Sequence, residues 1–128
     1  MAKIISISLN DEILDDIDDI QSNLGFSGRS EVIRAGIREL ITQNNKLSSL
    51  SGIVEGVLTV SHEEKNSQEF SKIRHRYQST IRTQVHHEME NHICLEVLIF
   101  KGDSDKIKKM FNDFSTSKHM IETKIIIS

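Results

Sequence analysis

The 128-residue sequence contains one cysteine, no tryptophan and no proline. A single thiol excludes an intrachain disulfide framework and is typical of proteins that work in a reducing compartment. No stretch approaches the ~20 consecutive apolar residues that a membrane-spanning helix needs. The first residues alternate and then turn acidic, which is not the pattern of a secretory signal. We therefore expect a cytoplasmic protein with no membrane partner.

The sequence also lacks a basic excess and the short motifs of common enzymes. Its net charge of −3 and its pI near 6.1 do not match the basic character of a typical nucleic-acid-binding domain. It contains no P-loop, no HExxH helix and no nucleophile elbow, so we do not expect an enzyme. Because net charge averages over the whole surface, the position of individual residues must decide whether the chain binds DNA.

Residues 1–47 predict a small domain of one strand and two helices. Residues 3–9 alternate as in a strand with one apolar and one mostly hydroxylated face. The apolar face carries Ile5, Ile7 and Leu9, and the other face carries Ile4, Ser6 and Ser8. Asn10 can cap a first helix that stops at Gly25, and Ser27 can cap a second helix.

One strand and two helices in fewer than fifty residues are marginal without a partner. The simplest solution is a homodimer in which residues 3–9 of two chains form an antiparallel ribbon over four helices. The alternative is that this strand joins the sheet of the following domain.

In the dimer, the outward face of the ribbon is a candidate for reading DNA bases. A two-stranded ribbon fits the major groove, where serine can hydrogen-bond to bases and Ile4 can contact a thymine methyl. Free backbone N–H groups at the start of the second helix suit a phosphate. The phosphate-binding candidates are Ser27, Gly28, Arg29 and Ser30. The alternative is that Ser6 and Ser8 are ordinary solvated positions and that the helix cap has no ligand.

Residues 3–41 resemble the ribbon-helix-helix transcription factors, at Leu9-Asn10-Asp11, Gly25-Phe26 and Arg29-Ser30-Glu31-Val32-Ile33-Arg34. The resemblance implies sequence reading by the outward ribbon residues and phosphate clamping at the start of the second helix. Many members carry Arg or Lys on the outward face of the ribbon, whereas this chain has Ile4 at the first outward position.

Residues 52–128 predict a second domain, which follows a polar helix tail and linker at 42–52. The expected strands are 53–61, 81–89, 93–101 and 120–127, and the expected helices are about 66–77 and 104–116. This βαββαβ order is that of the ferredoxin-like fold, to which ACT-like regulatory domains also conform. The predicted fold class is therefore α+β, with a ribbon-helix-helix domain followed by a ferredoxin-like domain.

The second domain gathers potential metal ligands around one hairpin. Alternation along strand 81–89 places His86 and Glu88 on one face, and the following turn brings Cys94 back toward them. A thiolate with nitrogen and oxygen donors suits Ni, Cu, Zn or Co better than Mg or Ca. Cys94 alone is explained as a small buried residue, and His87 as a core or interface residue. The shared face, the turn and the thiol together favour a metal site.

Residues 52–127 resemble the regulatory domain of the nickel-responsive ribbon-helix-helix repressors, at Cys94-Leu95-Glu96 and Lys101-Gly102-Asp103. The resemblance implies nickel(II), a homo-tetramer formed through these domains, and a metal site completed by a neighbouring subunit. The implied ligands are His86, Glu88 and Cys94 of one chain and His75 of another. Lys65 is implied to approach DNA phosphates once metal is bound.

Glu88 departs from the family pattern, which has a histidine at this position. A carboxylate oxygen weakens the nitrogen- and sulfur-rich square-planar coordination that selects nickel, so zinc, cobalt and copper are also candidates. A one-residue slip would use His87 instead, but it would exchange the two faces of the strand. His92 in the turn is a further substitute ligand.

Together the two halves predict a metal-responsive DNA-binding repressor. Metal between the second domains would fix the placement of two ribbon dimers and promote binding to a double-stranded operator. One alternative is a ribbon-helix-helix regulator whose ACT-like domain senses a small organic ligand such as an amino acid. Another is a metal-handling or enzymatic protein without a DNA role, although a subunit-completed site lacks the open position that catalysis needs.

Overall fold

The computed structural model describes residues 2–128, and the chain divides into two compact units. The N-terminal unit ends at Lys46, and the C-terminal unit runs from Leu47 to Ser128. Within the described residues, every helix is too short or too polar to cross a membrane.

The N-terminal unit contains two helices, α1 (Asp11–Leu24) and α2 (Arg29–Ser48). Asn10 caps α1 as predicted, because its side-chain oxygen accepts a hydrogen bond from the backbone N–H of Ile13 at 2.8 Å. Gly25 ends α1 in the left-handed conformation, with φ of 75°, which glycine adopts without steric cost. The predicted cap and stop of the first helix are therefore confirmed.

The start of α2 corrects the prediction for Ser27. The backbone N–H of Val32 donates to the carbonyl of Gly28 at 3.3 Å, so Gly28 holds the cap position. The chain still bends at residues 27–28, and helical geometry begins only at Arg29. The predicted cap is wrong by one residue.

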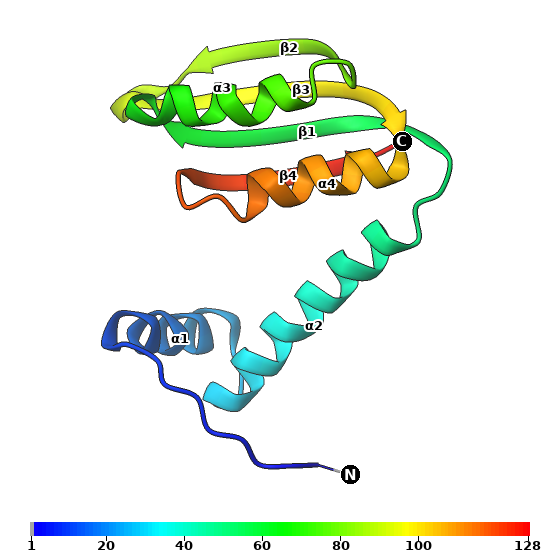
Figure 1. Ribbon diagram of the computed structural model, residues 1–128. Helices are drawn as coiled ribbons and strands as arrows, with labels where there is room; N and C mark the ends of the chain where they lie inside the picture. Colours follow the sequence, from blue (N-terminus) through cyan, green and yellow to red (C-terminus); the bar gives the residue numbers. More distant parts are fainter. Residues whose placement is uncertain (1) are drawn as a thin grey trace. The chain divides into compact units, whose positions relative to one another are not determined.

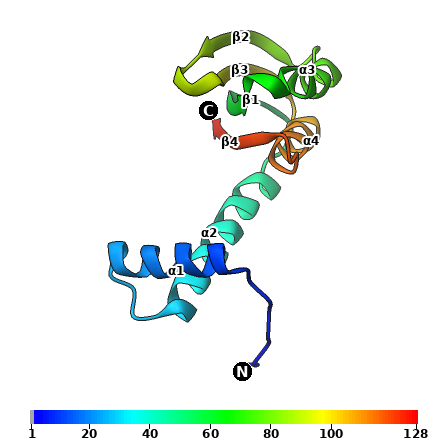
Figure 2. The ribbon, with the colours of Figure 1, turned by 90° about the vertical axis from the view of Figure 1, so that its left-hand side faces the viewer.

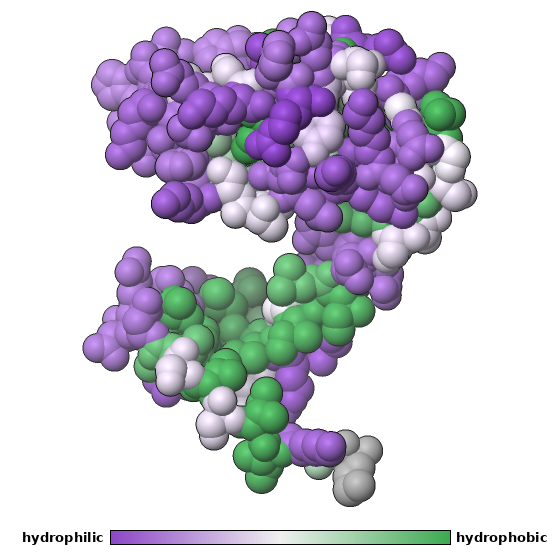
Figure 3. Space-filling view, viewed as in Figure 1, coloured by the Kyte–Doolittle hydropathy of each residue, from purple (hydrophilic) through white to green (hydrophobic). Residues whose placement is uncertain are grey.

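Residues 3–9 have no regular secondary structure in the single chain, and Ile4, Ile5 and Ile7 are 100%, 81% and 63% exposed. The four-stranded sheet of the C-terminal unit does not include this segment, so the alternative that it joins that sheet is wrong. Figure 3 shows apolar side chains gathered on the surface of the N-terminal unit. The exposed ones are Ile4, Ile5, Ile7, Ile13, Ile20, Leu24, Ile37, Leu40 and Ile41. So large an exposed apolar area is typical of an interaction surface.

The C-terminal unit has the predicted βαββαβ order. Its strands are β1 (Ile53–Glu63), β2 (Ile81–Glu88), β3 (Ile93–Asp103) and β4 (Met120–Ile127). Its helices are α3 (Ser67–Arg76) and α4 (Ser104–Ser115), with short 3-10 turns at η1 (Glu64–Asn66) and η2 (Glu90–His92). The strand order is β2-β3-β1-β4 with antiparallel neighbours, and both helices cover one face of the sheet (Figures 1 and 2).

The core lies between the sheet and the two helices. Strand alternation sends apolar residues of β1 and β3 inward, where they meet the apolar sides of α3 and α4. The apolar residues with no exposed surface are Leu58, Val60, Leu98, Phe100, Ile107, Met110 and Phe114. The opposite face of the sheet carries the exposed apolar side chains of Val85, Ile99 and Ile126.

Candidate metal centre

The β2–β3 hairpin brings several potential ligands to the helix-covered face of the sheet. The strand register pairs Glu88 with Cys94 and His86 with Glu96. Directly paired residues of antiparallel strands share a face, and Cys94 and Glu96 are both buried in it. His87 pairs with Leu95 and so lies on the opposite face.

The Cys94 thiol lies in surroundings that oppose its ionisation. Burial raises the pKa of the thiol above its usual value, and the carboxylates of Glu96, Glu64 and Glu88 raise that pKa further. A hydrogen bond with Ser67 partly opposes this rise in pKa. The thiolate therefore needs a nearby positive charge, which a bound metal ion would supply as it displaces the proton.

The Glu96 carboxylate holds the imidazole of His86 in one tautomer. The Nδ1 atom of His86 lies 2.8 Å from both carboxylate oxygens of Glu96. Because a carboxylate only accepts hydrogen bonds, Nδ1 carries a proton, and Nε2 is the ring atom that can bind a metal. The Gln84 amide also donates to Glu96 at 3.3 Å. A carboxylate behind a histidine commonly orients histidine ligands of metals.

His62, to which the sequence assigned no role, contacts the same carboxylate from β1. Its ring has no exposed surface, stacks on Phe70 at 5.1 Å, and places Nε2 3.1 Å from Glu96. Its Nδ1 donates to the backbone carbonyl of Glu63 at 2.8 Å. The buried Glu96 carboxylate thus contacts two imidazoles, those of His86 and His62. His62 and Glu96 fall at inward positions of alternating strands, and this alternation was the signal that could have revealed them.

A second group of potential ligands forms at the η2 turn. Ligand atoms of Glu64, Glu88 and His92 all lie within 4.8 Å of one another. In residues 2–128 this is the one set of three or more such atoms gathered to that distance, so His86 and Cys94 do not join Glu88 as tightly within a single chain. Sequence reasoning missed Glu64, because only the fold brings η1 to the turn.

The remaining predicted residues lie on the surface. His75 is exposed in the last turn of α3, and Lys65 is exposed in η1, with its Nζ 3.5 Å from the Glu63 carboxylate. Among the DNA-binding candidates, the exposed ones are Ile4, Ser6, Ser8, Ser27, Arg29 and Ser30, and Gly28 is half-buried.

Arg29 is engaged within the N-terminal unit. Its guanidinium donates two hydrogen bonds to the Asp18 carboxylate, at 2.9 Å and 3.0 Å. These hydrogen bonds lower the pKa of the Asp18 carboxyl and raise the pKa of Arg29. The pair joins α1 to the start of α2 and uses two of the five guanidinium N–H donors, so the others can still bind a phosphate.

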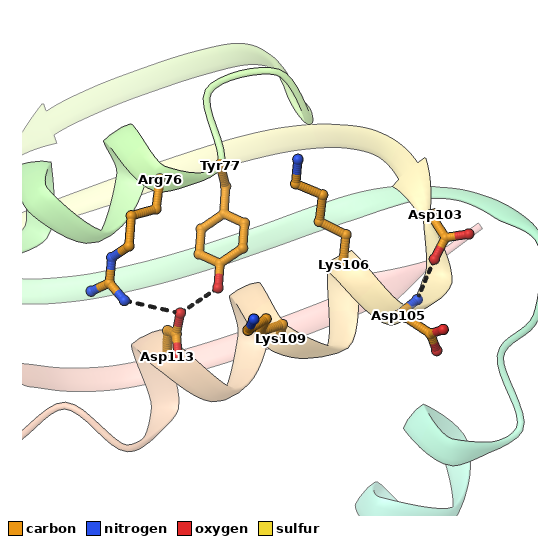
Figure 4. Close-up of a pocket in the computed structure, with 7 residues that line it drawn as sticks. All are labelled: Arg76, Tyr77, Asp103, Asp105, Lys106, Lys109 and Asp113. Atoms are coloured by element: carbon orange, nitrogen blue, oxygen red, sulfur yellow. Dashed lines mark hydrogen bonds and ion pairs between the residues drawn. The ribbon is translucent and has the colours of Figure 1, made fainter.

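A cavity of about 620 Å³ lies between the end of α3 and α4 (Figure 4). Asp113 bridges its two sides, because it accepts hydrogen bonds from the Tyr77 hydroxyl and from Arg76. Lys106 donates to the Ser79 hydroxyl at 3.2 Å. Since these polar groups hydrogen-bond to one another, we interpret the cavity as structural. We call this contact region of Arg76, Tyr77 and Asp113 the joint between α3 and α4.

We predict that this joint weakens at alkaline pH. Burial, followed by the hydrogen bond to Asp113, raises the pKa of Tyr77 from 10.0 to about 12. The unfolded phenol loses its proton near pH 10, so the stability that Tyr77 contributes is fully present below that pH and is lost as pH rises toward 12. Urea unfolding followed by circular dichroism should show a steeper loss of stability over this range in the wild type than in Tyr77→Phe. Equal slopes for the two proteins would contradict the prediction.

Comparisons with known proteins agree on one family. Residues 55–128 match the family described as the NikR C-terminal nickel-binding domain. A "Putative nickel-responsive regulator" of Methanococcus vannielii is 29% identical over 126 residues, covering 96% of this chain and 89% of the relative. A protein of the same name from Dictyoglomus thermophilum is 31% identical and covers 100% of this chain and 98% of the relative.

A solved structure shares the fold. An uncharacterized protein from Thermotoga maritima matches 59% of this chain and 98% of its own, with a TM-score of 0.55 and 16% identity. At that identity the likeness concerns the fold alone. The family match and the relatives together show that the chain belongs to the NikR family of nickel-responsive regulators.

Proposed function

We propose that this chain is a nickel-responsive DNA-binding repressor. Nickel bound between C-terminal units of a homo-tetramer would favour the arrangement in which two ribbon dimers meet one operator. Apart from family membership, one observation carries the proposal: Glu96 keeps the proton of His86 on Nδ1, and His86 shares a sheet face with the buried Cys94. Nε2 and the thiol thus give a transition metal one nitrogen and one sulfur donor on the same face of the hairpin.

The proposed nickel site takes Nε2 of His86, the thiolate of Cys94 and an oxygen of Glu88, with His75 of a second copy as the fourth ligand. Sulfur and nitrogen donors suit a borderline transition ion. When bound, the ion supplies a positive charge that stabilises the Cys94 thiolate. Glu88 is a harder donor than imidazole, so zinc, cobalt and copper compete more strongly here than at an all-nitrogen-and-sulfur site.

Two exposed apolar surfaces support the proposed assembly. One covers residues 3–9 and both helices of the N-terminal unit, where a second copy would complete the ribbon. The other is the outer face of the sheet, with Val85, Ile99 and Ile126. Covering such surfaces removes apolar area from water, which stabilises an oligomer by roughly 25 cal/mol per Å².

In the proposed mechanism, η1 couples metal binding to DNA binding. Glu64 in η1 contacts His92 in the hairpin turn at 3.1 Å, and the next residue is Lys65. Metal that orders the hairpin therefore orders η1 and the start of α3. We propose that Lys65 then contacts a DNA phosphate and adds to the binding of the ribbon.

The proposal is tested by measuring DNA binding with and without nickel. Operator sequences are selected from a random DNA pool with nickel-loaded protein, and affinity is then measured by gel shift at fixed salt. We expect one nickel per chain to strengthen operator binding at least ~10-fold, a typical allosteric coupling, and the gain to fade at low pH because Cys94 must lose its proton. Equal affinity of chelator-treated and nickel-loaded protein would overturn the metal switch.

A further inference from the structure

Glu64, Glu88 and His92 converge from three separate elements. Glu64 lies in η1, Glu88 ends β2, and His92 ends η2. All three side chains are exposed, and a hollow of about 340 Å³ borders Glu64 and His92. The group therefore has two carboxylates and an imidazole that solvent ions can reach.

Within the described residues, no lysine or arginine pairs with the two carboxylates of this group. The structure records no ion pair or hydrogen bond for the Glu88 carboxylate within the described part of the chain, and the Glu64 carboxylate contacts His92. Lys65, which borders the same hollow, pairs with Glu63 instead. Two carboxylates so close together repel each other, and a cation between them relieves the repulsion.

The spacing of the group suits a small divalent ion. Ligand atoms bind Zn²⁺-sized ions at ~2.0–2.2 Å, so two neighbouring ligands of one ion lie roughly 3.0–3.5 Å apart. The Nδ1 atom of His92 and Oε2 of Glu64 are 3.1 Å apart, within that range, and an ion bound between them would replace the proton of their present hydrogen bond. The third ligand atom lies within 4.8 Å of both, so a small side-chain movement completes the set. Water can fill the remaining positions on the exposed side.

We propose that Glu64, Glu88 and His92 form a second divalent-cation site, which shares Glu88 with the proposed nickel site. Its oxygen-rich ligand set favours Mn²⁺, Co²⁺ or Zn²⁺ with bound water over ions that need thiolate. Glu88 has two carboxylate oxygens and can serve both sites. An ion here ties η1 to the hairpin turn, and so it stabilises the segment that carries Lys65.

The test uses Mn²⁺, which the thiolate of the nickel site disfavours. The full-length wild type, Cys94→Ala and the double variant Glu64→Gln/His92→Gln are titrated with Mn²⁺, and free Mn²⁺ is measured by its EPR signal. A matched control, Glu63→Gln/His119→Gln, makes the same chemical changes outside the group. Glu88 is left intact because the nickel site also uses it.

We expect about one Mn²⁺ per chain for the wild type, for Cys94→Ala and for the control, and at least ~10-fold weaker binding for Glu64→Gln/His92→Gln. Binding by that double variant equal to the control would overturn the second site, as would a wild type that binds no Mn²⁺. The outcome is independent of the proposed function: a nickel response in gel shifts can persist when the Mn²⁺ site fails, and the reverse also holds.

Discussion

Replacing Cys94 by alanine is expected to lower the nickel affinity at least ~100-fold. The nickel-induced gain in operator binding should be lost with it. The thiol is the softest donor of the proposed site, and disturbing even residues that only orient a ligand typically costs 10–100-fold in metal affinity. Cys94 is buried, and the nearby carboxylates of Glu96, Glu64 and Glu88 are harder donors that replace a thiolate poorly. Nickel titration by equilibrium dialysis and gel shift of the same samples measure both effects.

The matched control for Cys94→Ala is Ser115→Ala, which also removes one heavy atom, at an exposed position of α4 outside the proposed nickel and DNA contacts. Circular dichroism shows whether each variant folds, because a buried cysteine also contributes packing. A folded Cys94→Ala protein that keeps the full nickel response would exclude the thiol from the sensing site.

An aspartate in place of Ile7 is expected to abolish specific DNA binding with or without metal. Ile7 lies on the apolar face of the predicted ribbon and is 63% exposed in the single chain. In the proposed dimer this face packs on four helices, where an unpaired carboxylate is strongly destabilising. Affinity should fall to the non-specific level, a loss of roughly 1,000-fold or more. Gel shifts with selected operators measure the loss.

Ser22→Asp on the exposed surface of α1 is the control, because it adds the same charge without touching the ribbon. It should bind operator as the wild type does. If Ile7→Asp also binds normally, residues 3–9 do not form the paired ribbon.

The sequence was sufficient for the order and approximate bounds of the strands and α-helices of the C-terminal unit, but not for its short 3-10 turns η1 and η2. Local rules also gave the cap at Asn10 and the stop at Gly25, but they missed the shift from Ser27 to Gly28, which depends on how the chain bends after α1. The proposed pairing of residues 3–9 with those of a second copy requires two chains, so a single chain does not contain it.

The candidate site was predictable only where ligands share one hairpin. His86, Glu88 and Cys94 are close in sequence, and strand alternation together with the turn puts them on one face. The contact of Glu96 with His62, and that of Glu64 with His92, join segments far apart along the chain. Such contacts arise from strand order, which residue spacing does not reveal.

The joint between α3 and α4 contains the one tyrosine of a sequence that has no tryptophan. Intrinsic tyrosine fluorescence therefore reports on the C-terminal unit alone, whereas the helices of the N-terminal unit contribute only to the far-ultraviolet signal. Denaturation followed by both signals would show whether the N-terminal unit unfolds before the C-terminal unit, and whether a bound metal ion stabilises one unit or both.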